Sequence, residues 1–318
     1  VWLLLSVDVG AAVRIMGRGI GVMLLGTAGI VLGAPIGYFV VHRWLDESAW
    51  RGFGALAGSW IGGTGNLAAA AAALETPPDQ FGLAVLADTA IYIGWLPLLL
   101  VSKSFADKFN KWTGVAADRL ERMEAAAAQE NKVERPPATR DVLYLLAIGF
   151  GATWLAQWLA PQLPEIEMGG ATVISTSTWV VLLVTTMGIA LSFTPAKNIP
   201  SSHNLAMGVV YVFVARMGAV ASLEGITQAP AFLVGAAIWI LVHGAFCLAG
   251  AWLFKVDVHS AAIASAANVG GAASAPVVAA HHKESLVPVS ILMALLGYAM
   301  GNYLAILTGH LCRIVGGG

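Results

Sequence analysis

Two short glycine-rich segments carry the residue types that best suit binding of a small ligand. The first reads Ser59-Trp-Ile-Gly-Gly-Thr-Gly-Asn66, and the second reads Ala267-Asn-Val-Gly-Gly-Ala-Ala-Ser274. Each lies inside an apolar, alanine-rich block, where every glycine weakens a helix by about 1 kcal/mol relative to alanine. A helix broken there exposes carbonyls on one side of the break and N–H groups on the other. Carbonyl, amide and hydroxyl oxygens suit Na⁺, and the N–H end suits a carboxylate or phosphate.

We therefore predict substrate- or ion-binding residues in both copies and on the apolar block that follows the second. They are Ser59, Gly62, Gly63, Thr64, Gly65 and Asn66 in the first copy, Ser265, Asn268, Gly270, Gly271 and Ser274 in the second, and Asn302. For a single glycine pair, close helix packing through small residues is the simpler explanation. Two copies in matching positions favour a transporter site, because paired glycine-interrupted segments are typical of such sites.

A carboxylate, Asp88, lies in the middle of another apolar block, next to Thr89 and one helical turn before Tyr92. A charge at the centre of a membrane costs about 2.5–3.5 kcal/mol even on the lenient insertion scale. A cation, a proton or a hydrogen-bonding neighbour must offset that cost. We predict that Asp88 and Thr89 belong to the ion or substrate site; a structural hydrogen bond to a neighbouring helix is the alternative.

Arg216 is a second charged residue within an apolar block, and its guanidinium could hold a substrate carboxylate through two hydrogen bonds. It could equally pair with Glu224 or extend toward the lipid headgroups. The sequence shows no nucleophile elbow, no zinc-binding histidine pair and no phosphate-binding loop. We therefore predict no enzyme activity, no structural metal and no cofactor, with Na⁺ as the expected coupling ion.

The elements that position these residues are expected to cross a membrane. Of the 318 residues, 58% are apolar and 11% are charged, with a net charge of −1, and the mean hydropathy is +0.77. A soluble domain carries about 25% charged residues, so this composition excludes a soluble enzyme and a nucleic-acid binder. We predict an all-α polytopic membrane protein with apolar segments at residues 1–9, 19–41, 52–74, 81–101, 142–160, 171–193, 205–223, 231–254, 260–280 and 286–311.

The longest polar stretch, residues 102–141, holds eight of the 17 basic residues. Loops rich in lysine and arginine stay on the cytoplasmic side, so we predict a solvated cytoplasmic connector with an amphipathic helix over residues 116–129. It divides the chain into a first repeat (1–101), the connector (102–141) and a second repeat (142–318). The expected location is the cytoplasmic (inner) membrane, with several crossings.

The two repeats contain four and six apolar segments, so we expect that about two N-terminal helices are missing from this sequence. Their relative orientation depends on the glycine pairs. If both segments cross the membrane, the repeats run parallel, whereas if both are re-entrant hairpins, the repeats are inverted. We favour hairpins, because inverted repeats bring the two breaks to one point at the midplane.

Three stretches carry a resemblance to a known family: residues 56–67, 267–276 and 296–303. Across essentially the whole chain, the sequence resembles the membrane family called domain of unknown function 819, grouped with the cation:proton antiporters and anion transporters. More distantly, Gly62-Gly-Thr-Gly65 is similar to the re-entrant loops of sodium–glutamate and 2-hydroxycarboxylate symporters. In the second copy Ala272-Ala273 replaces the Thr-Gly of that signature, so its role in substrate contact is less well supported than its helix break.

The resemblance implies inverted repeats, a homodimer, and a transport domain that moves against a scaffold like an elevator. Together with the residues above, it predicts a secondary active transporter in a lipid bilayer. The expected substrate is a small organic anion, an amino acid or a short peptide, coupled to Na⁺ rather than H⁺. The alternative is a channel-like or regulatory membrane protein without coupled transport. No nucleic-acid partner is expected.

Overall fold

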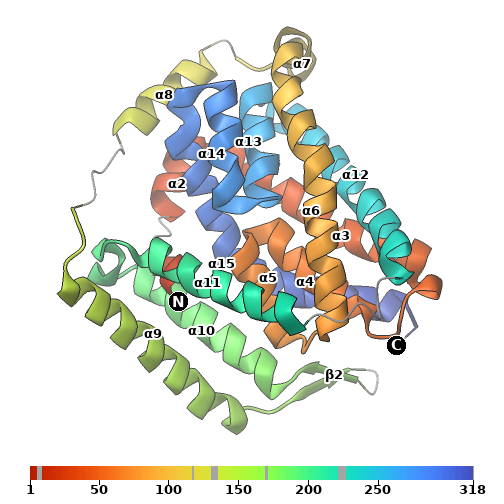
Figure 1. Cartoon of the computed structure of the whole chain (residues 1–318). Coiled ribbons are helices and arrows are strands. Elements are labelled where there is room, and N and C mark those ends of the chain that lie inside the picture. Colours follow the sequence, from red (N-terminus) through yellow and green to blue (C-terminus); the bar gives the residue numbers. More distant parts are fainter. Residues whose placement is uncertain (6–8, 117, 130–134, 169–170, 221–226, 318) are drawn as a thin grey trace.

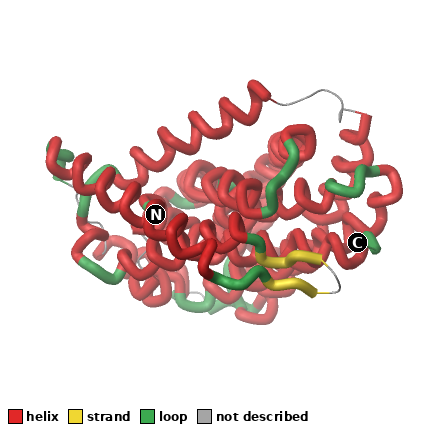
Figure 2. The backbone as a smooth tube through the Cα atoms, turned by 90° about the horizontal axis from the view of Figure 1, so that it is seen from below, coloured by secondary structure: helices red, strands yellow, loops and turns green. Residues whose placement is uncertain are grey.

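The computed structural model describes the chain except residues 6–8, 117, 130–134, 169–170, 221–226 and 318. In its first part, the described residues form helices joined by turns (Figures 1 and 2). The helices are α1 (Trp2–Leu5), α2 (Val9–Met16), α3 (Gly19–Val41), α4 (Ala49–Gly62), α5 (Thr64–Ala73), α6 (Pro78–Val101), α7 (Ala106–Thr113) and α8 (Arg119–Gln129).

The second part adds helices and one short β-hairpin. Its elements are α9 (Thr139–Leu159), β1 (Ile166–Met168), β2 (Ala171–Ile174), α10 (Thr176–Ser192), α11 (Ser202–Val220), α12 (Ala229–Phe254), α13 (Val258–Asn268), α14 (Gly271–His282) and α15 (Val287–Val315). The antiparallel pair β1–β2 is the only sheet among the described residues.

Helices α3, α6, α9, α12 and α15 are long and apolar enough to cross a membrane, and α10 is a shorter apolar helix. This agrees with the predicted all-α membrane protein. Two of the predicted segments differ from single crossings: residues 52–74 contain α4 and α5, and residues 260–280 contain α13 and α14. A third, 171–193, begins as strand β2 and becomes helical only at Thr176.

Helices α3 and α12 pack closely because glycines line their interface. Gly29 faces Phe246, Gly33 faces Trp239, and Gly37 touches the backbone carbonyl of Gly235. These three glycines recur every four residues, so they share one face of α3. A Cβ at each would collide with α12, and small residues allow such close approach where no hydrophobic effect drives helices together. As the residue numbers rise along α3, the numbers of their partners on α12 fall, so the two helices run antiparallel.

In Figure 1, α7, α8 and the outer ends of α13 and α14 lie at one end of the molecule, which we call the connector end. Strand β2 and the C-terminus lie at the other, which we call the distal end. Helices α9, α10 and α11 form a group beside the rest (Figure 1), which we call the side group. The other membrane helices, α3 to α6 and α12 to α15, form the core group.

The connector is less solvated than the sequence suggests. Met123 of α8 is only 5% exposed and packs into the core cluster beneath α13 and α14. Arg119 pairs with Asp257, and Glu124 Oε1 lies 2.5 Å from Nζ of Lys283. Since Asp257 precedes α13 and Lys283 follows α14, helix α8 clamps both legs of that helix pair.

Candidate functional site

The first candidate site segment is the helix pair α4–α5. Gly54 faces Leu74 and Gly58 faces Ala70, so the chain turns back on itself and the two helices run antiparallel. The turn is at Gly63, whose backbone has φ +75° and ψ −176°. A side chain is strained at positive φ, which makes glycine the residue that permits this reversal.

The second segment is the helix pair α13–α14. His259 near the start of α13 lies beside His282 at the end of α14, with 3.0 Å between their Nδ1 atoms. These helices therefore also return on themselves. Their turn contains Gly270 and Gly271, with φ of +121° and +59°. In both pairs, the glycines lie at the turn between the two helices, which we call the tip. The two helices of a pair, which we call its legs, lie side by side.

The two tips touch. A Cβ built on Gly271 would lie 3.2 Å from Cα of Gly63, and one built on Gly63 would lie 3.3 Å from the ring of Tyr298. Neither position has room for a side chain without displacement of its neighbour. Helices α5 and α14 both begin at this contact, so the positive ends of two helix dipoles meet near one point.

Asp88 of α6 binds to the first helix pair. Its Oδ2 accepts a hydrogen bond from Ser59 Oγ at 2.9 Å, and its Oδ1 accepts one from Trp60 Nε1 at 2.9 Å. Both donors are neutral, and among the described residues no cation forms an ion pair with this carboxylate. The hydrogen bonds to a neighbouring helix match the structural alternative; an ion-binding role stays a prediction.

A second polar centre lies on α13. Ser265 Oγ accepts a hydrogen bond from Trp95 Nε1 at 3.0 Å and lies 2.9 Å from Nε2 of His243. His243 is fully buried, and its Nδ1 lies 2.9 Å from the carbonyl of Gly26. This histidine is held on both sides within the protein, as expected for a packed rather than a proton-carrying group.

Among the described residues, three buried polar side-chain atoms near the tips make no well-formed hydrogen bond: Tyr92 Oη, Ser274 Oγ and Asn302 Oδ1. The hydroxyls of Tyr92 and Ser274 are close enough to interact with each other. Tyr92 and Ser274 both border Gly270. Leaving a buried donor or acceptor unpaired costs about 1–3 kcal/mol. Such atoms are therefore candidates for contact with a ligand or a bound water.

A cavity of about 300 Å³ adjoins the first tip. Asn66, Thr185, Tyr298 and Asn302 are among its lining residues, together with valines from α10 and α11. Asn302 Nδ2 donates to Thr185 Oγ1 at 2.8 Å, and Asn66 Nδ2 donates to the carbonyl of Tyr298 at 3.1 Å. The cavity thus lies between the core group and the side group, with a few amides and hydroxyls on an apolar wall.

Some predicted site residues lie apart from the polar groups at the tips. Thr89 is exposed and donates to the carbonyl of Val85 within its own helix. Asn268 is fully buried and bonds to Thr27 and to the carbonyl of Met23, which ties α13 to α3. The structure does not bring either side chain to the tip contact.

Three further predicted residues need separate mention. Arg216 is exposed on α11, and Glu224, its suggested partner, lies outside the described residues. Thr64 and Gly65 form the first turn of α5, and Gly65 lines the cavity. Gly62 packs against the side chain of Asn66 and the carbonyl of Gly297, with no room for a Cβ.

Sequence reasoning missed Trp60 as a partner of Asp88 and Tyr298 as the ring beneath both tips. Trp60 follows Ser59 directly, but nothing in the sequence tells which of two adjacent side chains faces α6. Tyr298 stands in the stretch 296–303, whose similarity to a family carries no information on contacts. Among the described residues, no group of three or more His, Cys, Asp or Glu could hold a metal ion.

Comparison with known proteins gives a family but not an activity. The chain is 25% identical over 322 residues to "Uncharacterized membrane protein YjcL" of Bacillus subtilis (strain 168). The alignment covers 97% of this chain and 79% of that protein. No solved structure matches it significantly. The model of the family described as protein of unknown function DUF819 matches residues 1–315. Because this match spans nearly the whole chain, the protein belongs to the DUF819 family of membrane proteins.

Proposed function

We propose that this protein is a secondary active transporter of the cytoplasmic membrane that moves a small organic anion, an amino acid or a short peptide. The observation that carries the proposal is the contact between the glycine tips of two returning helix pairs, at Gly63 and Gly271. Two helix N-termini at one point offer N–H groups and partial positive charge to an anionic solute. Helix breaks of this kind, placed at the interface of two repeats, are the usual substrate sites of secondary transporters.

The orientation of the flanking helices supports inverted repeats. α3 precedes the first helix pair and α12 precedes the second. These two helices run antiparallel, since Gly26 lies beside Cys247 while Gly37 lies beside Gly235. Equivalent helices of opposite direction are what two inverted, re-entrant hairpins require, and such symmetry underlies alternating access.

The coupling ion is proposed to be Na⁺, with H⁺ as the second choice. Asp88 is a carboxylate within a membrane helix, and from the described residues it accepts hydrogen bonds of the neutral donors Ser59 and Trp60. A monovalent cation beside it would neutralise the charge in a medium where charge is costly. The nearby hydroxyls of Tyr92 and Ser274, which lie beside each other at Gly270, add oxygen ligands of the kind that Na⁺ accepts.

We further propose that the core group moves as a transport domain against the side group, in a homodimer, as the resemblance to sodium–glutamate and 2-hydroxycarboxylate symporters implies. The cavity beside Asn66 lies between these two groups. A solute bound there would change its accessibility whenever one group slides past the other.

The test is uptake by proteoliposomes that contain the purified protein. Candidate organic anions, amino acids and dipeptides are supplied outside, with Na⁺ or H⁺ gradients imposed separately. Accumulation that follows one gradient and is lost in Asp88→Asn supports the proposal. Equilibration of a solute without dependence on any gradient would instead support a channel. If no candidate solute crosses the membrane, although the protein is folded with or without Na⁺, the result would favour a regulatory protein.

A further inference from the structure

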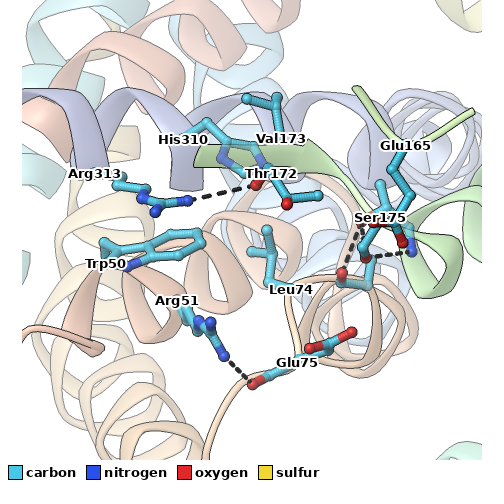
Figure 3. A pocket seen from close by; sticks show the side chains of 12 residues that line it. Trp50, Arg51, Leu74, Glu75, Glu165, Thr172, Val173, Ser175, His310 and Arg313 are labelled. Carbon is cyan, nitrogen blue, oxygen red and sulfur yellow. Dashed lines mark hydrogen bonds between the residues drawn. The ribbon is translucent and has the colours of Figure 1, made fainter. Parts of the chain in front are cut away.

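A separate hollow of about 390 Å³ lies at the distal end, at the legs of the first helix pair and away from its tip. Figure 3 shows its lining side chains. Residues from the start of α4, the end of α5, strand β2 and the end of α15 meet there. None of the residues predicted from the sequence lies in it, so this hollow is independent of the proposed transport site.

One wall of the hollow is cationic. The indole of Trp50 is held between two guanidinium groups, with Cζ of Arg51 5.2 Å and Cζ of Arg313 5.3 Å from a ring centroid. Arg51 donates to the carbonyl of Glu75 at 2.9 Å, and Arg313 donates to that of Thr172 at 3.4 Å. Within the described part of the chain, neither arginine forms an ion pair, and Nε of Arg51 is buried without a hydrogen-bond partner.

A buried histidine belongs to the same wall. His310 is 8% exposed, and its ring centroid lies 5.4 Å from that of Trp50. Its ring interacts with the backbone of Val173, but among the described residues its Nε2 has no hydrogen-bond partner, and a buried polar atom left unpaired costs about 1–3 kcal/mol. Arg51, Arg313 and His310 therefore lie around Trp50, and each can form further hydrogen bonds with a ligand.

The facing wall carries two carboxylates. Glu75 Oε1 accepts a hydrogen bond from Ser177 Oγ at 2.8 Å, and Glu165 Oε1 accepts from the backbone N and the hydroxyl of Thr176 at 3.2 Å. Both side chains lie across the hollow from Arg313 in Figure 3. All these donors are neutral, and no ion pair to either carboxylate is formed by the described residues.

From this separation of charge we propose that the hollow binds a small zwitterion. Its carboxylate or phosphate lies against Arg51, Arg313 and His310, and its ammonium group lies against Glu75 and Glu165. A guanidinium binds either anion through paired hydrogen bonds. A simple anion would meet the two carboxylates, and a simple cation would meet the two arginines, so a molecule with both charges fits best.

Two sources supply this chemistry: a free α-amino acid, or the phosphoethanolamine headgroup of a membrane lipid. Both carry an ammonium group a few bonds from an anion. The full chain, purified in detergent, is titrated in Na⁺-free buffer by calorimetry with each of the twenty L-α-amino acids and with O-phosphoethanolamine. Acetate, inorganic phosphate and ethylammonium serve as probes that carry charge of one sign only.

We expect saturable binding of at least one zwitterion, and binding of the single-charge probes that is weaker by about tenfold or more, as expected for loss of one charged hydrogen-bonding group. Binding of amino acids alone identifies a free solute, and binding of O-phosphoethanolamine alone identifies a lipid headgroup. If no zwitterion binds, or if acetate or phosphate binds as tightly as the zwitterions, the proposal is wrong.

Variants locate the binding. Arg313→Gln should weaken it about tenfold or more. Glu165→Gln, a change at an exposed residue outside every helix, should remove the preference for a zwitterion over acetate while the protein stays folded. Lys108→Gln removes an exposed charge on α7, outside this hollow, and should leave binding unchanged. Equal affinity in all three variants would contradict the assignment. Asp88→Asn should also bind normally, which separates this result from failure of the proposed transport function.

Discussion

At the scale of single residues, Asp88 carries a charge, but a neutral side chain of the same shape could make the same hydrogen bonds. Ser59 Oγ and Trp60 Nε1 each donate to one carboxylate oxygen. An asparagine can keep both contacts, because its oxygen accepts from the indole while its amide donates to the hydroxyl. The substitution Asp88→Asn therefore removes the charge and leaves the geometry in place.

We expect Asp88→Asn to abolish stabilisation of the protein by Na⁺. A ligand at 100 times its Kd adds about 2.7 kcal/mol to the free energy of unfolding, and this gain requires the ion's counter-charge. The measurement is the midpoint of thermal unfolding in detergent with NaCl against choline chloride. Ser290→Ala, outside the predicted ion-binding residues, is the control: it loses one hydrogen bond, from Oγ to the carbonyl of Val287 at 2.7 Å, worth about 0.5–1.5 kcal/mol, and should keep the Na⁺ response. An unchanged response in Asp88→Asn would remove Asp88 from the ion site.

The glycines at the tips are the second residue-scale feature. Gly271 has φ +59°, and a Cβ there would lie 3.2 Å from Cα of Gly63. Gly271→Ala should lower the free energy of unfolding by about 1–2 kcal/mol from backbone strain alone, and more from separation of the tips. Gly94→Ala is the control, because Gly94 lies inside α6 with open space around its Cα and alanine favours a helix by about 1 kcal/mol.

Thermal unfolding and uptake should both distinguish these two variants. Gly271→Ala is expected to lose most uptake at temperatures where the variant is still folded. Gly94→Ala should preserve uptake and raise the unfolding midpoint. Wild-type uptake in Gly271→Ala would show that the tip contact has no part in transport.

At the scale of elements, the sequence predicts much of the helical framework, and the reasons for its failures are physical. Apolar blocks of sufficient length predict α3, α6, α9, α12 and α15, because only a helix satisfies its backbone within lipid. The strand pair β1–β2 was missed because Ala171–Ile174 is as apolar as the helix that follows it. Hydropathy does not separate a short strand from the start of a helix.

Helix α8 shows a second limit of sequence reasoning. Its composition marks an amphipathic helix, but the face that it covers is set by residues more than a hundred positions away, Asp257 and Lys283. The partners of Asp88 and the ring of Tyr298 were missed for the same reason. Spacing along the chain locates the polar residues, whereas the packing of distant helices decides which of them meet.

The clamp made by α8 leads to a prediction on pH. Burial by itself would raise the pKa of Glu124, but hydrogen bonds from Lys283 and Ser285 outweigh burial and hold this pKa below its ordinary value. A carboxyl group with a lowered pKa stabilises the folded contact above its unfolded pKa of about 4.3. That contribution is lost as the pH falls through the lowered pKa. Acid should therefore loosen the contact of α8 with the end of α14, where Lys283 and Ser285 lie.

Hydrogen-exchange protection of α8 amides checks this. Glu124→Gln should lower their protection at neutral pH by at most about fivefold, the effect of about 1 kcal/mol for a partly exposed ion pair. It should also remove the loss of protection in acid. Arg122→Gln breaks only an exposed pair with Asp118 and should change neither. Equal acid sensitivity in the wild type and in Glu124→Gln would assign the release to another group.

At the scale of the whole molecule, the core group and the side group meet at the distal end through few polar contacts. Ser177 Oγ donates to Glu75 Oε1 at 2.8 Å, and Thr178 Oγ1 donates to the carbonyl of Ala73 at 2.9 Å. Such contacts are weak enough to break during a domain movement. By contrast, glycines allow α3 and α12 to approach closely along their length, so these helices are expected to move as one body.

A crosslink across the boundary therefore tests motion of the whole molecule. Glu75→Cys combined with Ser177→Cys places two thiols near each other, because the present side chains touch. Joining them with a short, reducible thiol-reactive crosslinker should stop uptake while leaving thermal stability intact. Reduction should restore uptake, because the block is mechanical. Asp46→Cys combined with Gln228→Cys is the matched control: these residues are also in hydrogen-bond contact. Asp46 lies between α3 and α4, and Gln228 directly precedes α12, so both are attached to helices of the core group. The same crosslinker should leave uptake unchanged, since the link lies within the body that moves. If the first crosslink forms and uptake continues at the wild-type rate, the core group does not slide against the side group at this boundary.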